Sequence, residues 1–157
     1  MSEDPVTAID QVMRIMDRAF DPHWREAWNR AQIESSLALP HCYLLLADAD
    51  GVAIDGDAGG VAAGFVLARR APGEEELLLI AVDPDARKNG VGRALLEQFH
   101  RYARDNGAER VFLEMRENNP AERLYRDCGY EQIGLRKAYY RTLTGDRIDA
   151  LTFGKTL

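Results

Sequence analysis

Hydrophobic residues recur at helical spacing near the start of the chain. The pattern consists of Val6, Ile9, Met13, Met16 and Phe20. Side chains three and four positions apart share one face of a helix, so the pattern predicts an amphipathic helix that stops near Asp21-Pro22. A second helix is predicted from about Trp24 to Leu37, and Pro40 closes this helical region.

Three apolar runs follow and predict strands. They occupy residues 42–47, 61–69 and 77–82. The first two are separated by residues 51–60, which are rich in Gly and Asp and predict a long hairpin loop. Residues 77–82 are nearly all apolar, as expected for a strand that is covered on both faces.

The period of the pattern changes again after Gly90. A helical stripe is formed by Val91, Ala94, Leu95, Phe99 and Tyr102. Asn106-Gly107 supplies the stop signal of this helix. In residues 110–115 the side chains alternate, with Val111, Leu113 and Met115 on one face and Phe112 and Glu114 on the other, which predicts a strand.

The last third of the chain predicts a short helix and a hairpin. Asn119 is a good N-cap, Pro120 fits the first helical position and Glu122 fits a capping box, so a helix is predicted from there to Cys128. Residues 130–140 and 148–153 read as two strands joined across Thr144-Gly145-Asp146.

This order of elements predicts an α/β fold. Helices and strands alternate in the middle of the chain, which favours a sandwich around a mixed sheet of six to seven strands flanked by about four helices. The 157 residues, of which 46% are hydrophobic, are enough for one sizeable core. We see no repeat or linker, and therefore expect a single domain over residues 1–157.

Charge and cysteine usage exclude several classes of function. Acidic residues outnumber basic ones by 26 to 20, for a formal net charge of -6, so a nucleic acid is not expected as the main partner. Cys42 and Cys128 lie far apart and indicate neither a disulfide framework nor a metal site. His23, His41 and His100 share no metal-binding or triad spacing, and no metal is predicted.

The N-terminus has no basic segment followed by an apolar core, and no apolar run approaches the length of a membrane span. A cytoplasmic protein without a membrane partner is the expectation.

The segment after residues 77–82 has the composition of an anion site. Its residues include Arg87, Lys88, Asn89, Gly90, Val91, Gly92 and Arg93. Glycines let backbone N–H groups approach a phosphate, and the N-terminus of the following helix adds partial positive charge. Leu95 stands where a dinucleotide-binding fingerprint has its third glycine, and no Gly-Lys-Ser/Thr follows, so neither of those motifs is present. A plain strand-to-helix connection is the alternative.

Following Ile80-Ala81-Val82-Asp83-Pro84, the pattern Arg87-x-x-Gly90-x-Gly92 resembles the acetyl-CoA pyrophosphate motif of the GNAT superfamily. The family's next strand and helix are similar to Leu113-Glu114-Met115-Arg116, Asn118, Ala121, Leu124-Tyr125 and Gly129-Tyr130. The RimI type, alanine N-acetyltransferases that act on a ribosomal-protein N-terminus, has a tail similar to Arg136-Lys137-Ala138-Tyr139-Tyr140, Gly145-Asp146 and Asp149-Ala150. The resemblance covers most of the chain and implies a GNAT-like sandwich with acetyl-CoA as co-substrate.

The resemblance also implies roles for individual residues. The acetyl-CoA-binding positions would be Ile80, Ala81, Val82, Arg87, Lys88, Asn89, Gly90, Val91, Gly92, Arg93 and Asn118. Backbone groups of the first three would pair with the pantetheine arm, the loop would bind the pyrophosphate, and Asn118 would contact the arm. Glu114 matches the general base, and Tyr125 matches the tyrosine near the thioester sulfur. The segment between Glu114 and Asn118 is one residue shorter than in the family pattern.

The chemistry of acyl transfer asks for the same two groups. An ammonium cannot attack a thioester, so a carboxylate must take a proton, and a departing thiolate benefits from a nearby acidic hydroxyl. Glu114 and Tyr125 fit these tasks, and Glu76 on the adjoining strand is a second candidate base. Tyr139 and Tyr140 are expected on opposite faces of a strand, so at most one of them faces the acceptor.

Trp24 and Trp28 lie a helical turn apart, which is more typical of a core than of a ligand platform. The family commonly lines its acceptor groove with this region.

The leading hypothesis is therefore a protein N-terminal acetyltransferase, with a ribosomal protein among the implied acceptors. A small-molecule amine or antibiotic acetyltransferase is the alternative within the same chemistry. A non-catalytic acyl-CoA-binding module is the alternative of another class, and the presence of Glu114 and Tyr125 argues against it. Acetylation of aminoacyl-tRNA is disfavoured by the acidic balance.

Overall fold

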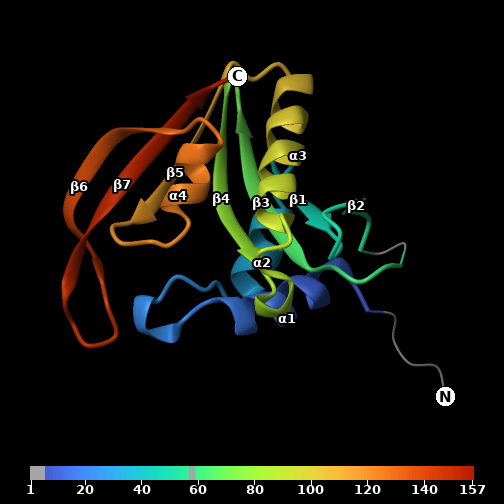
Figure 1. Cartoon of the computed structure of the whole chain (residues 1–157), viewed down its shortest axis with the longest axis horizontal. Helices are drawn as coiled ribbons and strands as arrows, with labels where there is room; N and C mark the ends of the chain where they lie inside the picture. The colour runs from blue at the N-terminus through green and yellow to red at the C-terminus, as the bar shows by residue number, and fades with distance from the viewer. Residues whose placement is uncertain (1–5, 57–58) are drawn as a thin grey trace.

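The computed structural model describes residues 6–56 and 59–157. In chain order the elements are α1 (Ala8–Ala19), η1 (Pro22–Trp24), α2 (Arg30–Leu37), β1 (Cys42–Ala47), β2 (Ala53–Ile54), β3 (Gly64–Ala71), β4 (Glu74–Val82), η2 (Pro84–Ala86), α3 (Val91–Asp105), β5 (Arg110–Arg116), α4 (Glu122–Asp127), β6 (Glu131–Arg141) and β7 (Arg147–Thr156), where η marks a 3₁₀ turn. The strands form one sheet in the order β2-β1-β3-β4-β5-β7-β6 (Figure 1).

The sheet is mixed, as the sequence predicts. β4 and β5 pair in parallel, and the other neighbouring strands pair antiparallel. A parallel pair needs a crossover connection, which α3 provides between β4 and β5. The sheet therefore continues from the parallel β4–β5 pair into the long β6–β7 hairpin, whose strand β7 lies beside β5 (Figure 1).

Helices cover both faces of the sheet. Alternate side chains of β3 show the division, because Val66 and Ala68 pack with α3 and α4 whereas Phe65 and Leu67 pack with α1 and α2. Successive side chains of a strand point to opposite faces, so β3 takes part in two separate cores. Burial on both sides also explains why residues 64–68 of this strand are all apolar or glycine.

Several sequence predictions are confirmed at the level of whole elements. Helix α3 begins at Val91 and ends at Asp105, and Gly107 follows with φ 86°. Strand β5 buries Val111 and Leu113 on one face, as the alternation predicts. The β6–β7 hairpin turns through the predicted Thr144-Gly145-Asp146 segment.

The predicted apolar face of the first helix is partly wrong. The buried face of α1 includes Val12 and Ile15, whereas Val6 is 66% exposed. Thr7 is the N-cap and closes a capping box with Asp10, so Val6 precedes the helix. The face of α1 that packs against the sheet is therefore rotated from the predicted face and includes Val12, Ile15 and Met16.

The predicted helix from Trp24 to Leu37 is wrong in its first half. The chain forms η1 there, and α2 begins only at Arg30. Asn29 accepts a hydrogen bond from the Gln32 backbone and the Gln32 side chain accepts one from the Asn29 backbone, which defines the start of the helix. Residues 25–29 are consequently an irregular segment.

Helix α4 begins later than predicted. Its N-cap is Ala121, without a side-chain cap, and its first residue is Glu122. Asn119 Oδ1 accepts from the Ala121 backbone N–H at 2.9 Å, so this side chain stabilises the turn before the helix. The predicted capping box with Glu122 does not form.

The predicted loop at residues 51–60 contains the two-residue strand β2. Residues 57–58 of this loop, and residues 1–5 at the N-terminus, lie outside the described part of the chain. Within residues 6–56 and 59–157, no helix has the length and apolar content needed to cross a membrane.

Candidate active site

Strands β4 and β5 are neighbours for only part of their length. Their parallel pairing ends at Leu77 and Leu113, although β4 continues to Val82 and β5 to Arg116. Beyond that point the two strands diverge (Figure 1). β5 remains paired with β7 along its whole length, so the divergence opens the sheet between β4 and β5 alone.

Strand β4 is also irregular where the divergence begins. Its pairing with β3 passes from Leu77 to Leu79, so Leu78 forms a β-bulge. Beyond the bulge one side of β4 pairs with β3, and the other side has no strand partner among the described residues. Backbone N–H and C=O groups of residues 80–82 on that side are therefore available to a ligand that binds like an added strand.

A cavity of about 210 Å³ lies at the divergence. The residues that line it are Phe20, Arg25, Glu26, Trp28, Leu77, Leu78, Leu79, Ile80, Leu113, Glu114, Met115, Asn119, Tyr125 and Tyr140. They come from β4, β5, the irregular segment before α2, the β5–α4 connection, α4 and β6. Both predicted catalytic residues are among them, and they share the cavity with the strand edge described above.

Glu114 is half-buried on β5, with its side chain 22% exposed. Its carboxylate forms an ion pair with Arg136 of β6, whose Nε lies 3.2 Å from Glu114 Oε2. The shortened segment after Glu114 does not move this residue out of the cavity. The carboxylate is therefore placed where it can accept a proton from a molecule in the cavity.

Tyr125 is almost completely buried on α4, at 4% exposure. Burial raises the pKa of its hydroxyl well above the usual value, and the negative charge of Glu26 raises it further. No hydrogen bond to this hydroxyl is found among residues 6–56 and 59–157. The group consequently stays protonated at any ordinary pH and is free to donate to a ligand, as a general acid must.

The loop between β4 and α3 has the geometry of an anion cradle. Gly90 is the N-cap of α3 with φ 79°, a conformation that glycine adopts without strain, and no side chain caps the helix. The backbone N–H groups of Val91, Gly92 and Arg93 at the first turn of α3 are therefore left for a ligand. Because the Val91 side chain is buried in the core, this residue can contribute only its backbone.

The charged side chains of this loop do not all point the same way. Lys88 and Arg93 are exposed, and Asn89 between them is exposed as well. Arg87 Nη2 donates to the Ala19 carbonyl oxygen at 3.0 Å, at the C-terminal end of α1. In this structure Arg87 thus stabilises the contact between the loop and α1.

Two neighbouring asparagines are placed differently. Asn118 is exposed, has φ 62° and does not line the cavity. Asn119 does line it. The contact with the pantetheine arm that the resemblance implies for Asn118 remains a prediction, and Asn119 is a second candidate for that contact.

The alternative base, Glu76, lies in the paired half of β4. It is opposite Phe112 of β5 and Arg69 of β3, and it forms an ion pair with Arg69. Glu76 does not line the cavity that contains Tyr125.

Aromatic residues from β6 and from the segment before α2 complete the walls. Tyr140 lines the cavity, whereas Tyr139 is 51% exposed beneath the Arg136 guanidinium. Burial raises the pKa of Tyr140 to about 12, and the charges of Glu114 and Glu26 contribute to this shift. Trp28 lines the cavity too.

Glu26 and Arg116 were missed by sequence reasoning. Glu26 lies in the segment that had been predicted as helix, and Arg116 is a strand residue followed by a loop. The two side chains form an ion pair, with Nε and Oε1 3.1 Å apart, across 90 positions of sequence. No local pattern signals a contact over that separation.

The buried histidine His100 lies in the core and does not line the cavity. Its Nε2 lies 2.7 Å from the Tyr130 hydroxyl. Burial lowers the pKa of His100 to about 4, and the positive charges of Lys155 and Arg104 contribute. In the described part of the chain, no three His, Cys, Asp or Glu side chains are grouped as metal ligands.

Comparison with known proteins places this arrangement in a family. Residues 9–130 match the model of the acetyltransferase (GNAT) family. The N-alpha-acetyltransferase RimI of Mycobacterium tuberculosis is 35% identical over 122 residues, which are 77% of this chain and 72% of that protein. The ribosomal protein bS18-alanine N-acetyltransferase of Escherichia coli K12 is 38% identical over 93 residues, which are 59% of this chain and 62% of the relative.

The fold agrees with these sequence matches. The crystal structure of the ribosomal-protein-S18-alanine N-acetyltransferase from Escherichia coli superimposes with a TM-score of 0.79 at 27% identity. The superposition covers 99% of this chain and 91% of that one.

Proposed function

Because this chain belongs to the acetyltransferase (GNAT) family, as an acetyl-CoA-dependent N-acetyltransferase of the RimI type, we propose that its acceptor is the α-amine at the N-terminus of a protein. The cavity between β4 and β5 carries the proposal, because it brings a carboxylate and a protonated tyrosine together beside an unpaired strand edge. Relatives named for N-terminal and ribosomal-protein alanine acetylation support the choice of acceptor.

In this proposal, backbone groups of β4 and of the first turn of α3 bind acetyl-CoA. The free edge of β4 at residues 80–82 suits the amide-rich pantetheine arm, and the first turn of α3 suits the pyrophosphate. Lys88 and Arg93 add positive charge near the same loop. With acetyl-CoA bound in this way, its thioester would lie at the β4–β5 divergence, within reach of the cavity residues.

Glu114 accepts the proton that the acceptor nitrogen must lose before it bonds to the acetyl carbon. Tyr125 donates a proton to the sulfur as the C–S bond breaks, so the thiol leaves neutral. Glu114 afterwards releases its proton to solvent, and Tyr125 regains one. The position of Glu76 outside the cavity supports Glu114 as the base.

The acceptor is tested by thiol release with a panel of amines. Three classes of amine are compared at saturating acetyl-CoA. They are hexapeptides with a free N-terminal alanine, the same hexapeptides with a blocked N-terminus and a lysine side chain, and small amines such as tyramine. We expect the highest kcat/KM with the free N-terminal peptides, and mass spectrometry should find the acetyl group on the α-nitrogen. Turnover with small amines alone would contradict the proposed acceptor.

Tyr125→Phe is expected to lower kcat about 100-fold, at the lower end of the range for general acid–base catalysis, because a thiol is already a fair leaving group. The ring still packs against Tyr130, with centroids 5.8 Å apart, so the melting temperature and acetyl-CoA affinity should change little. Tyr139→Phe, at an exposed position outside the cavity, is the matched control. Near-normal turnover of a folded Tyr125→Phe protein, measured with chemistry rate-limiting, would reduce Tyr125 to a packing residue.

A further inference from the structure

Arg116 joins three segments that surround the cavity. Its side chain is only 7% exposed at the end of β5. Nε donates to Glu26 Oε1 at 3.1 Å, and Nη1 donates to the backbone oxygens of Asn118 at 2.8 Å and Glu117 at 3.3 Å. One guanidinium thereby connects β5, the β5–α4 connection and the irregular segment before α2.

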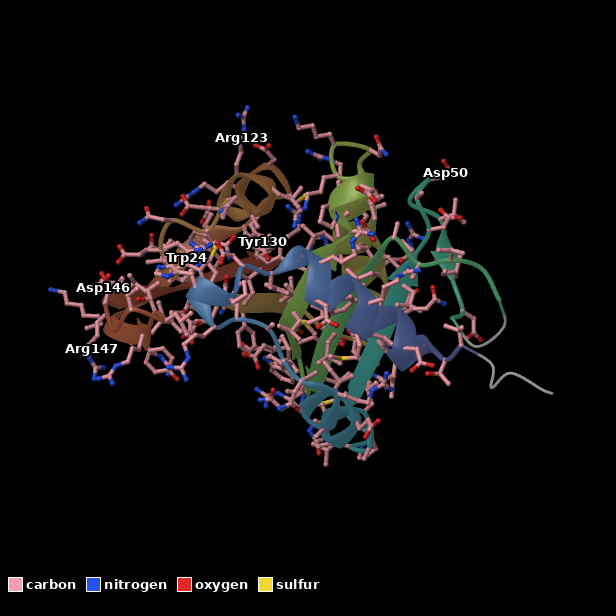
Figure 2. All side chains as sticks on the ribbon, turned by 90° about the horizontal axis from the view of Figure 1, so that it is seen from below. Trp24, Asp50, Arg123, Tyr130, Asp146 and Arg147 are labelled. Carbon is pink, nitrogen blue, oxygen red and sulfur yellow. The ribbon has the colours of Figure 1, made fainter. Side chains whose placement is uncertain are left out.

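An aromatic ring covers the remaining face of this guanidinium. Arg116 Cζ lies 3.8 Å from the centroid of Trp24, a cation–π contact. In Figure 2 Trp24 lies on the same side of the molecule as Asp146 and Arg147 of the β6–β7 hairpin. The hairpin is tied to this region through the Leu143 backbone N–H, which donates to the His23 carbonyl oxygen at 2.8 Å.

The backbone takes a left-handed conformation in each of the two loop segments that Arg116 connects to β5. Arg25, next to Glu26, has φ 57°, and Asn118 has φ 62°. Residues other than glycine rarely adopt such conformations, which persist where surrounding contacts impose them. The hydrogen bonds from Arg116 to Glu26 and to the Asn118 carbonyl are contacts of that kind.

Glu26 presents its carboxylate to the cavity. It is one of the lining residues, with its side chain 23% exposed. Oε1 pairs with Arg116, and no partner for Oε2 is found within the described residues. Glu26 lines the same cavity as Glu114 and Tyr125, which places this carboxylate on the wall that the reacting groups share. Its negative charge also contributes to the raised pKa of the Tyr125 hydroxyl.

We propose that Glu26 binds the ammonium group of the incoming acceptor, and that Arg116 is the positioning residue that holds the Glu26 carboxylate in the cavity. The assignment rests on the proposed function, since it needs Glu114 as the separate proton acceptor. An amine is mostly protonated at neutral pH, so an anionic contact favours its entry. Arg116 offsets part of the Glu26 charge, which keeps the ammonium from being held too tightly to lose its proton.

The first test compares Glu26→Gln with the wild type. Glutamine keeps the shape and can still accept from Arg116 Nε, but it has no charge for an ammonium. We expect the KM for the alanine hexapeptide to rise about tenfold or more, the scale of a hydrogen bond to a charged group. kcat and the acetyl-CoA Kd should change less than about threefold. The matched control is Glu109→Gln, at an exposed position on the α3–β5 loop.

The second test is a double-mutant cycle on the acceptor KM. Arg116→Gln should raise this KM in the wild-type background and add little in the Glu26→Gln background, because the first change removes the placement of the carboxylate and the second removes its charge. Arg116→Lys keeps a cation and should restore part of the loss. If Arg116→Gln does not fold, the same cycle is measured with Arg116→Lys. A purely structural Arg116 would give multiplicative effects and lower kcat as well.

The results separate this inference from the choice of acceptor. An unchanged acceptor KM in Glu26→Gln, or a fall in kcat at constant KM, would overturn the role of Glu26. If tyramine rather than the peptide is acetylated, the proposed acceptor is wrong, and the same variants are then measured with tyramine. A higher tyramine KM in Glu26→Gln would still support ammonium binding by Glu26.

Discussion

Glu114→Gln is expected to lower kcat about 10²–10⁴-fold, the largest effect that we predict for a single side chain. Glutamine has nearly the same shape as glutamate, so the cavity should keep its form, but its amide cannot accept the proton of the acceptor. Glu114 must also be ionised to act, so activity in the wild type should fall on the acidic side of the pH–rate profile. The acetyl-CoA Kd should stay nearly constant, because the predicted contacts with that substrate lie on β4 and α3.

The control for this experiment is Glu76→Gln. Glu76 has the same charge and lies on the neighbouring strand, but it is paired with Arg69 outside the cavity. Steady-state kinetics over a range of pH, together with melting temperatures, compare the two variants. A fully active Glu114→Gln protein beside an inactive Glu76→Gln protein would transfer the base role to Glu76.

Gly92→Val is expected to weaken acetyl-CoA binding by about tenfold to 100-fold, the scale of one or two lost hydrogen bonds to a charged group. A Cβ at this position would lie 3.1 Å from Leu124 Cδ2 and 3.7 Å from Val82 Cγ2. The branched valine therefore crowds the first turn of α3 and presses on α4, which carries Tyr125. Shielding of the N–H groups and displacement of α4 both act against the bound substrate.

Gly92→Ala is the matched control, because its single methyl group is close only to the end of the flexible Leu124 side chain and lies at ordinary van der Waals distance from Val82. We expect a smaller loss of affinity and no loss of thermal stability, since alanine favours the helix over glycine by about 1 kcal/mol. Isothermal titration calorimetry with acetyl-CoA measures the Kd of each variant. An unchanged Kd in a folded Gly92→Val protein would show that the α3 loop does not bind the pyrophosphate.

Local patterns in the sequence predicted the elements that depend on neighbouring residues. Helix α3 follows from a sustained helical stripe with a glycine at each end, and β5 follows from apolar side chains at every second position, Val111, Leu113 and Met115. The second helix was predicted too long because the Asn29–Gln32 capping box inside it went unrecognised. Periodicity reports which side chains are buried, whereas a helix start depends on a few specific hydrogen bonds.

The sequence by itself determined the mixed α/β fold, the glycine-containing loop between β4 and α3 and the placement of Glu114 and Tyr125 on consecutive elements. Only the tertiary structure decided that β4 and β5 diverge beyond Leu77, since strand separation depends on the packing of whole layers. It also decided that Asn119 rather than Asn118 faces the cavity, and that Glu26 meets Arg116 across 90 positions of chain. These features arise from contacts between segments far apart in sequence, whose relative placement is set by packing rather than by any local pattern.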